Sequence, residues 1–157
     1  MSNATESTRL VTFRLGEHLF AAEIHAVQRV LRYEAPRVLP DMPDWMEGVV
    51  DYQSVMVPVI DMRRRFGLVA SEPGPQSRLM VCSAPGGLAA MLVDAVLDVK
   101  PVQPSDMMDP PELFRGLTGE YLKGLTRRQG QLVVVLDVES LLASQVPLRF
   151  QPDVAGA

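Results

Sequence analysis

Short apolar runs separated by turn residues recur along most of the chain. Residues 10–15 and 18–22 are apolar runs of strand length, and Gly16-Glu17 between them predicts a tight hairpin turn. Similar runs predict further strands at 48–52, 55–60, 79–83, 87–93, 96–102, 121–125 and 131–136. Many short strands at intervals of about 8–12 residues favour an all-β barrel or sandwich.

Helical patterns are few and short. The apolar residues of 24–31 are spaced for a helical turn or two, although the end of this segment also fits an extended chain. Asp61 and Asp137 each follow a predicted strand and precede a short segment, which is the position of a helix N-cap. The sequence therefore predicts short helices over 62–66 and from 138 to about 144.

An internal repeat organises the chain. A shift of 76 positions places Trp45 on Tyr121 and Asp61 on Asp137, and a shift of 69 extends the match upstream. Chance agreement between two apolar hairpins is the alternative interpretation. We expect one domain over 9–144, built from two similar units, with flexible tails outside it. A β unit of about 60 residues is only marginally stable alone, so the two should share an apolar interface. Exchange of strands between them is left open. The expected units are 9–70 and 78–143, and the tails are 1–8 and 151–157.

Composition narrows the function classes. Hydrophobic residues make up 47% of the chain but aromatic residues only 6%, which predicts an aliphatic core. The net charge of −4 argues against a nucleic acid or an anionic membrane as partner. The lone cysteine, Cys82, lies in an apolar run and is expected to be buried and unreactive. No apolar stretch reaches the roughly 18 residues of a membrane span, and we expect a cytoplasmic protein without membrane insertion.

The sequence contains no recognisable catalytic or metal-binding motif. His18 and His25 have no ligand spacing with Cys82 or with each other, and no phosphate loop or nucleophile elbow occurs. Asp61 and Asp137 could be paired acids, but their places in the repeat fit helix capping better. The arginines of 63–65 could bind phosphate, but a solvated helix face is the simpler interpretation. We therefore expect a binding module that is not an enzyme and needs no cofactor or metal.

Residues 45–68, WMEGVVDYQSVMVPVIDMRRRFGL, resemble the CheW-like domain family, which has a similar Gly-Val hairpin, a V-x-P-V-x-D-[LM]-R segment and a following F-G-L. The similarity extends upstream through FRLGEHLFAAEI and downstream through AMLVDAVLDV and YLKGL. It covers about residues 10–143. The resemblance implies a mainly β fold of two five-stranded, SH3-like barrel lobes packed together. Short helices would follow the lobe hairpins and close the C-terminal end.

The resemblance also implies a function. Members of the family are non-enzymatic adaptors that couple chemoreceptors to the histidine kinase CheA in bacterial chemotaxis signal transduction. The implied partners are the regulatory domain of the kinase and the cytoplasmic tip of a methyl-accepting chemoreceptor. The chain itself would be a monomer when isolated and would be recruited to receptor arrays. Carried onto this sequence, the kinase-contact positions are Val27, Gln28, Arg29, Val30, Glu47 and Gly48. The receptor-contact positions, in the groove between the lobes, are Leu92, Val93, Val96, Val99 and Gly124.

Three positions depart from the family pattern. The family hairpin usually reads N-L-R-G, but Gln53 and Ser54 stand here in place of the arginine and glycine. The residue after V-Q is usually acidic, and here it is Arg29. The usual base and acid are thus both lost, which fits either neutral drift of an exposed pair or a shifted partner specificity.

The alternatives to the adaptor role are two. The chain could be a divergent accessory protein that competes for array positions or serves a non-flagellar, pilus-type system. From another class, it could be a small β-barrel protein that binds a ligand between its lobes.

Overall fold

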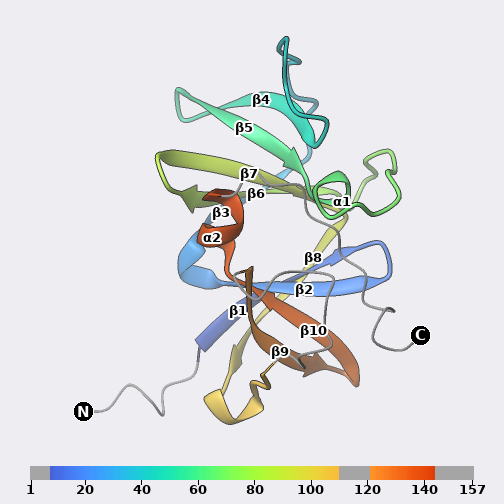
Figure 1. Ribbon diagram of the computed structural model, residues 1–157, viewed down its shortest axis with the longest axis vertical. Helices are drawn as coiled ribbons and strands as arrows, with labels where there is room; N and C mark the ends of the chain where they lie inside the picture. Colours follow the sequence, from blue (N-terminus) through green and yellow to red (C-terminus); the bar gives the residue numbers. More distant parts are fainter. Residues whose placement is uncertain (1–7, 110–120, 144–157) are drawn as a thin grey trace.

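Two β sheets stacked on each other form the body of the molecule (Figure 1). The computed structural model describes residues 8–109 and 121–143. The strands of the described residues are β1 (Thr8–Leu15), β2 (His18–Glu23), β3 (Val27–Arg32), β4 (Met46–Tyr52), β5 (Val55–Asp61), β6 (Arg78–Ala84), β7 (Gly87–Val93), β8 (Ala95–Val102), β9 (Leu122–Arg128) and β10 (Gln131–Leu136). Short helical segments are η2 (Ile24–Ala26), α1 (Met62–Arg65), η3 (Pro104–Asp106) and α2 (Val138–Ala143). The predicted mainly β fold, with short helices after two hairpins, is confirmed.

Each sheet has five strands and curls into a lobe. Lobe A has the order β8-β1-β2-β10-β9, and lobe B has the order β3-β6-β7-β5-β4. The pairs β2–β10 and β5–β7 are parallel, and the other neighbours are antiparallel. In lobe B the connector after β3 pairs Arg37 with Val49 of β4. In lobe A the connector after β8 pairs Met108 with Leu125 of β9. These single bridges link the two ends of each sheet, as a barrel requires.

The chain passes between the lobes twice. Lobe B is one continuous segment, 27–93, whereas lobe A combines 8–23 with 95–136. The first crossing runs through η2 and the second through Asp94. Each lobe therefore takes two strands from one repeat unit and three from the other. The lobe boundaries thus differ from those of the repeat units, 9–70 and 78–143.

The repeat is visible in matching hydrogen bonds. The backbone N–H of Asp61 donates to the carbonyl of Trp45 at 2.8 Å, and that of Asp137 donates to Tyr121 at the same distance. The Asp61 carboxylate also accepts from the backbone N–H of Arg63 at 3.0 Å, and Asp137 accepts from Ser140 at 3.2 Å. Both aspartates therefore cap short helices, as predicted.

The largest core fills the space between the lobes. It is built from buried side chains of both sheets and both α helices, among them Phe13, Phe20, Phe66, Met80, Met91, Val134 and Leu141. Phe20 stacks on Phe13 and Phe66, with ring centroids 5.9 and 5.3 Å apart. Smaller cores lie inside each lobe. Because strands such as β1 and β2 bury both faces, their apolar residues form continuous runs instead of alternating.

One local prediction holds only in part, and another is wrong. The helical spacing of 24–31 gives only the single turn η2, and the rest is β3, because backbone pairing with β6 outweighs a weak local pattern. The arginines after Asp61 do not share a solvated face. Arg65 is buried with its guanidinium 4.7 Å from the Trp45 ring centroid, and Arg63 is ion-paired, while only Arg64 is exposed. Except for Thr8, the tails predicted at 1–8 and 151–157 lie outside the described residues.

Cys82 lies in the core between the lobes. Its side chain is fully buried, and that burial raises the pKa of the thiol to about 12. A thiol with so high a pKa carries almost no thiolate at neutral pH. The predicted burial of Cys82 is confirmed, and the raised pKa of its thiol agrees with the expected lack of reactivity.

Candidate protein-interaction surface

β3 carries four of the six predicted kinase-contact residues. It is an edge strand of the sheet of lobe B. Gln28, Arg29 and Val30 are exposed, Val30 by 39%, and Val27 is partly buried against the core between the lobes. Gln28 sits at an irregularity in the pairing with β6 and donates a hydrogen bond to the Ser83 hydroxyl at 3.2 Å. The side chains of this segment are therefore available to a partner.

Glu47 and Gly48 lie on β4, at the other end of the sheet from β3. Gly48 is buried and has φ +145°, and a Cβ on it would come within 2.1 Å of the Arg37 carbonyl oxygen. The bridge from the connector therefore requires glycine here. The backbone that approaches Gly48 closely belongs to the chain itself.

The predicted receptor-contact residues are placed unevenly. Leu92 and Val93 are 7% and 1% exposed and belong to two cores, so their side chains offer no surface to a partner. Val96 is half-buried against the core between the lobes, and Val99 is 43% exposed on β8. Gly124 is buried, and a Cβ there would lie 3.0 Å from the Met108 carbonyl oxygen. The glycine at this position is thus explained by a bridge within the chain, without a partner.

Gln53 and Ser54 form the tip of the β4–β5 hairpin. Both have positive φ, 51° and 65°, which only glycine, asparagine and aspartate adopt readily. The equivalent turn between β9 and β10 has Gln129 at φ 51° and Gly130 at 83°. The first hairpin therefore carries strain at Ser54 that the second avoids at Gly130, while Gln53 and Gln129 share the same φ.

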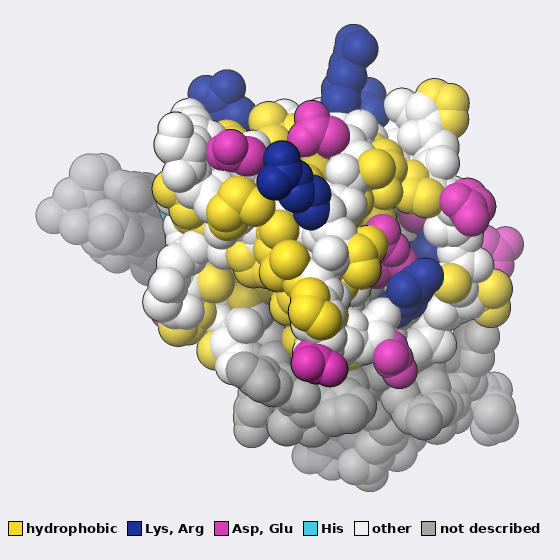
Figure 2. Space-filling model, turned by 90° about the horizontal axis from the view of Figure 1, so that it is seen from above, with side chains coloured by type: hydrophobic (Ala, Val, Ile, Leu, Met, Phe, Trp, Pro, Cys, Tyr) yellow, Lys and Arg dark blue, Asp and Glu magenta, His cyan; other side chains and the backbone are white. Residues whose placement is uncertain are grey.

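Apolar side chains gather at the end of the molecule that carries β4 and β5. Val55 and Met56 are each 51% exposed, and Val38 is 77% exposed on the connector before β4. Figure 2 shows apolar side chains on this face, with acidic and basic ones between them. The sequence did not identify this surface, because Val55 and Met56 belong to a continuous apolar run that looks like an ordinary buried strand.

An ionic cluster ties the lobes together at the second crossing. Asp94 accepts hydrogen bonds from the Arg63 guanidinium at 2.6–3.0 Å and from the backbone N–H of Gly16 at 2.6 Å. Burial alone would raise the pKa of Asp94, but the hydrogen bonds from Arg63 and Gly16 lower it overall. The sequence offered no signal for this contact, because α1, the β1–β2 turn and the β7–β8 junction are far apart along the chain.

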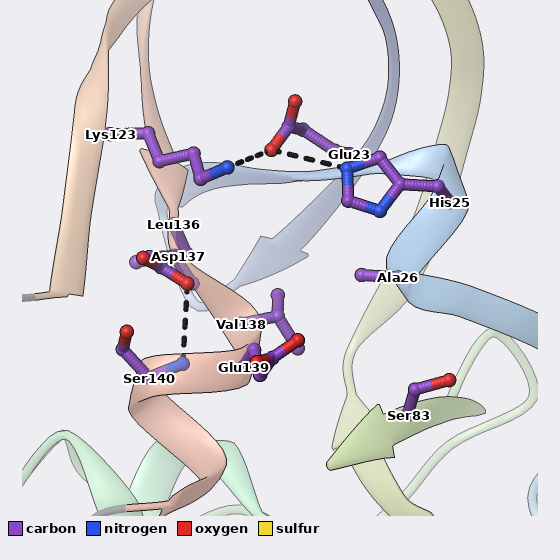
Figure 3. A pocket seen from close by; sticks show the side chains of 10 residues that line it. All are labelled: Glu23, His25, Ala26, Ser83, Lys123, Leu136, Asp137, Val138, Glu139 and Ser140. Carbon is purple, nitrogen blue, oxygen red and sulfur yellow. Dashed lines mark hydrogen bonds and ion pairs between the residues drawn. The ribbon is translucent and has the colours of Figure 1, made fainter. Parts of the chain in front are cut away.

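A pocket of about 310 Å³ opens at the first crossing (Figure 3). Lys123 forms an ion pair with Glu23, and the hydrogen bond that its ammonium group donates to this carboxylate raises the pKa of Lys123. His25 lies 3.5 Å from the same carboxylate, while Asp137 is occupied in capping α2. The described residues contain no group of three or more His, Cys, Asp or Glu placed to hold a metal ion. The charges at this pocket largely satisfy one another.

The ligand-binding alternative receives little support from this geometry. Neither Asp94 nor Arg29 lines the pocket at His25, since Asp94 is bound to Arg63 and Arg29 lies on β3. Packed apolar side chains fill the space between the lobes. Within 8–109 and 121–143, no helix is long and apolar enough to cross a membrane.

Comparison with known proteins gives a consistent result. The family model of the CheW-like domain matches residues 9–146. Chemotaxis protein CheW of Treponema pallidum is 28% identical over 144 residues, covering 89% of this chain and 85% of that protein. Protein FrzA of Myxococcus xanthus is 27% identical over 132 residues, covering 83% and 82%. The crystal structure of a CheW scaffolding protein from Thermoanaerobacter tengcongensis superposes with a TM-score of 0.80 at 23% identity, covering 92% of this chain and 99% of that one.

Proposed function

Since the chain belongs to the CheW-like domain family, we propose that it is an adaptor that couples chemoreceptors to the histidine kinase CheA. The family match over residues 9–146 is the observation that carries the proposal. Relatives bearing the name chemotaxis protein CheW cover most of the chain. The adaptor acts by binding and orienting other proteins, without catalysis and without a cofactor.

The kinase contact belongs to lobe B in this proposal. Val27, Gln28, Arg29 and Val30 lie on an edge strand, and three of the four are exposed. Glu47 is half-buried on β4, which ends the same sheet on its other side. Gly48 acts indirectly, by letting the connector between β3 and β4 close against the sheet.

The receptor contact belongs to β8 and its surroundings. Val99 and the partly exposed side chain of Val96 form its accessible part. Val99 is the repeat equivalent of Val30, so the two lobes present a matching valine on strands that each end a sheet. Equivalent edges on two lobes allow one chain to hold two different partners at once. Of the other predicted positions, only Val93 lies in the core against which Val96 packs.

A titration tests the proposal. The intact chain is titrated by calorimetry with the regulatory domain of the kinase and, separately, with the receptor's cytoplasmic tip, both from the same organism. Saturable binding to each at micromolar concentrations is expected. Absence of binding to both partners at tens of micromolar would contradict the coupling role.

A further inference from the structure

The edge of lobe B formed by β3 has an unpaired side. Its backbone pairs with β6 alone, and no backbone hydrogen bond to another strand involves 28–32 within the described ranges. The row of N–H and C=O groups on the outer side is therefore open to an extended segment of another chain. Val30, 39% exposed, adds an apolar contact on the same strand.

This edge is also basic. Arg29 and Arg32 are exposed on β3, and because their positions differ by three they point to opposite faces and flank the open backbone. Arg37 is exposed on the connector that follows. None of the three has an ion-pair partner in the described part of the chain, and the nearest acid in sequence, Glu34, makes no ion pair with them.

These three arginines are distinguished by their clustering on β3 and the connector that follows it, since Arg9 and Arg127 also have no ion pair among the described residues but lie apart from each other. Arg63 and Arg128 bind aspartates at 2.6 and 2.7 Å, and Lys123 is paired with Glu23. The chain as a whole is acidic, with a net charge of −4. An unneutralised basic edge on an acidic protein attracts a partner of opposite charge and repels a basic one.

We propose that β3 docks an acidic, extended segment of the kinase partner, with Arg29 and Arg32 binding its carboxylates. The inference rests on the proposed adaptor function and adds the charge of the surface that the partner must present. Arg29 and Arg32 thereby determine specificity, because a partner with a basic segment at this place would be rejected.

Edge strands often carry charges only to prevent aggregation, and this simpler role has to be separated from docking. A carboxylate on an edge strand opposes aggregation as well as a guanidinium does. Charge reversal therefore leaves protection against aggregation in place while it inverts the complementarity to a partner.

The experiment compares two double variants in the intact chain. R29E/R32E reverses the charge of the β3 edge. R9E/R127E makes the same change in net charge at two exposed arginines of lobe A that likewise have no ion pair within the described residues. Affinity for the regulatory domain of the kinase is measured at low and high salt, and thermal unfolding verifies that each variant is folded. R29A/R32A, which introduces no carboxylate, is measured in the same way.

We expect R29E/R32E to bind about tenfold more weakly at low salt, R29A/R32A to lie between, and R9E/R127E to bind like the unmodified chain. The affinity of the unmodified chain should also fall more steeply with salt than that of R29E/R32E. Equal affinities for the two reversed variants would overturn the acidic-segment proposal and leave the adaptor function standing. Failure of the unmodified chain to bind the kinase would overturn both.

Discussion

Glycine at matching places in the two hairpins has a steric cause. Gly48 and Gly124 each face the connector that bridges to their strand, and a side chain would meet its backbone oxygen. The two sites differ in severity. At Gly48 the clash is with backbone at 2.1 Å and φ is positive, whereas at Gly124 the nearest atom is the mobile end of Met107 at 2.9 Å. The same residue type is thus required strictly in lobe B and less strictly in lobe A.

The substitution Gly48→Ala should destabilise the protein by about 3 kcal/mol or more, through the clash and the positive φ. Gly124→Ala should cost about 1 kcal/mol, because the Met107 side chain can move and the Met108 oxygen, at 3.0 Å, has to shift by only a few tenths of an ångström. Urea unfolding of both variants gives the two values. A loss at Gly124 equal to that at Gly48 would contradict this ranking.

The hairpin tip at Gln53-Ser54 gives a second residue-scale prediction. Ser54→Gly should stabilise the protein by about 1 kcal/mol, because glycine adopts the left-handed conformation without the steric cost of a Cβ. The repeat supplies the matched control, since Gly130→Ser should destabilise by a similar amount. Thermal unfolding measures both, and a Ser54→Gly variant no more stable than the parent would count against strain at this turn.

Elements were predicted well where the pattern is local. The paired strands around turns and the two caps, at Asp61 and Asp137, followed from apolar runs and capping chemistry, and the structure has them at those places. The assignment of strands to lobes could not be predicted from local pattern, because it depends on where the chain passes from one lobe to the other. Nothing in the local pattern at η2 or Asp94 indicates that the chain leaves one sheet for the other. For the same reason the Arg63–Asp94 contact, which depends on the crossing, could not be predicted.

The Arg63–Asp94 contact predicts how stability depends on pH. The pKa of Asp94 is lower in the folded protein than its ordinary value of about 3.9, so ionised Asp94 stabilises the fold. That stabilisation is complete above the ordinary pKa and is lost as the pH falls through the lower, folded-state pKa. Asp94→Asn should cost roughly 2 kcal/mol at pH 7 and less at pH 3. Urea unfolding across this range measures it, and a loss independent of pH would contradict the ionic origin.

At the scale of the whole molecule, two barrels joined by one core present two edges in a fixed relation. The candidate site was predicted in part: β3 and Val99 are exposed as a contact surface requires, whereas Leu92 and Val93 lie in the cores. Apolar strand residues look alike in sequence whether they face a core or a partner, so the exposed ones could be separated only in three dimensions.

The equivalent valines of the repeat, Val30 and Val99, allow a test of whether the two lobes bind different partners. Val30→Asp should weaken kinase binding by about tenfold and leave receptor binding unchanged, because it places an unpaired charge at an apolar contact on lobe B alone. Val99→Asp should do the reverse. Parallel titrations with each partner decide this, and loss of both interactions in either variant would show that the surfaces are not separate.

The central claim is that this chain joins receptor and kinase into one complex. The most direct measurement is co-sedimentation of the full-length kinase with vesicles bearing the receptor's cytoplasmic fragment, with and without the chain. The adaptor account predicts that the chain increases the sedimented kinase in a saturable manner. It also predicts that the Val30→Asp variant, although it binds the vesicles itself, needs about tenfold more kinase to reach the same increase. The same amount of sedimented kinase in the presence and absence of the chain would contradict it.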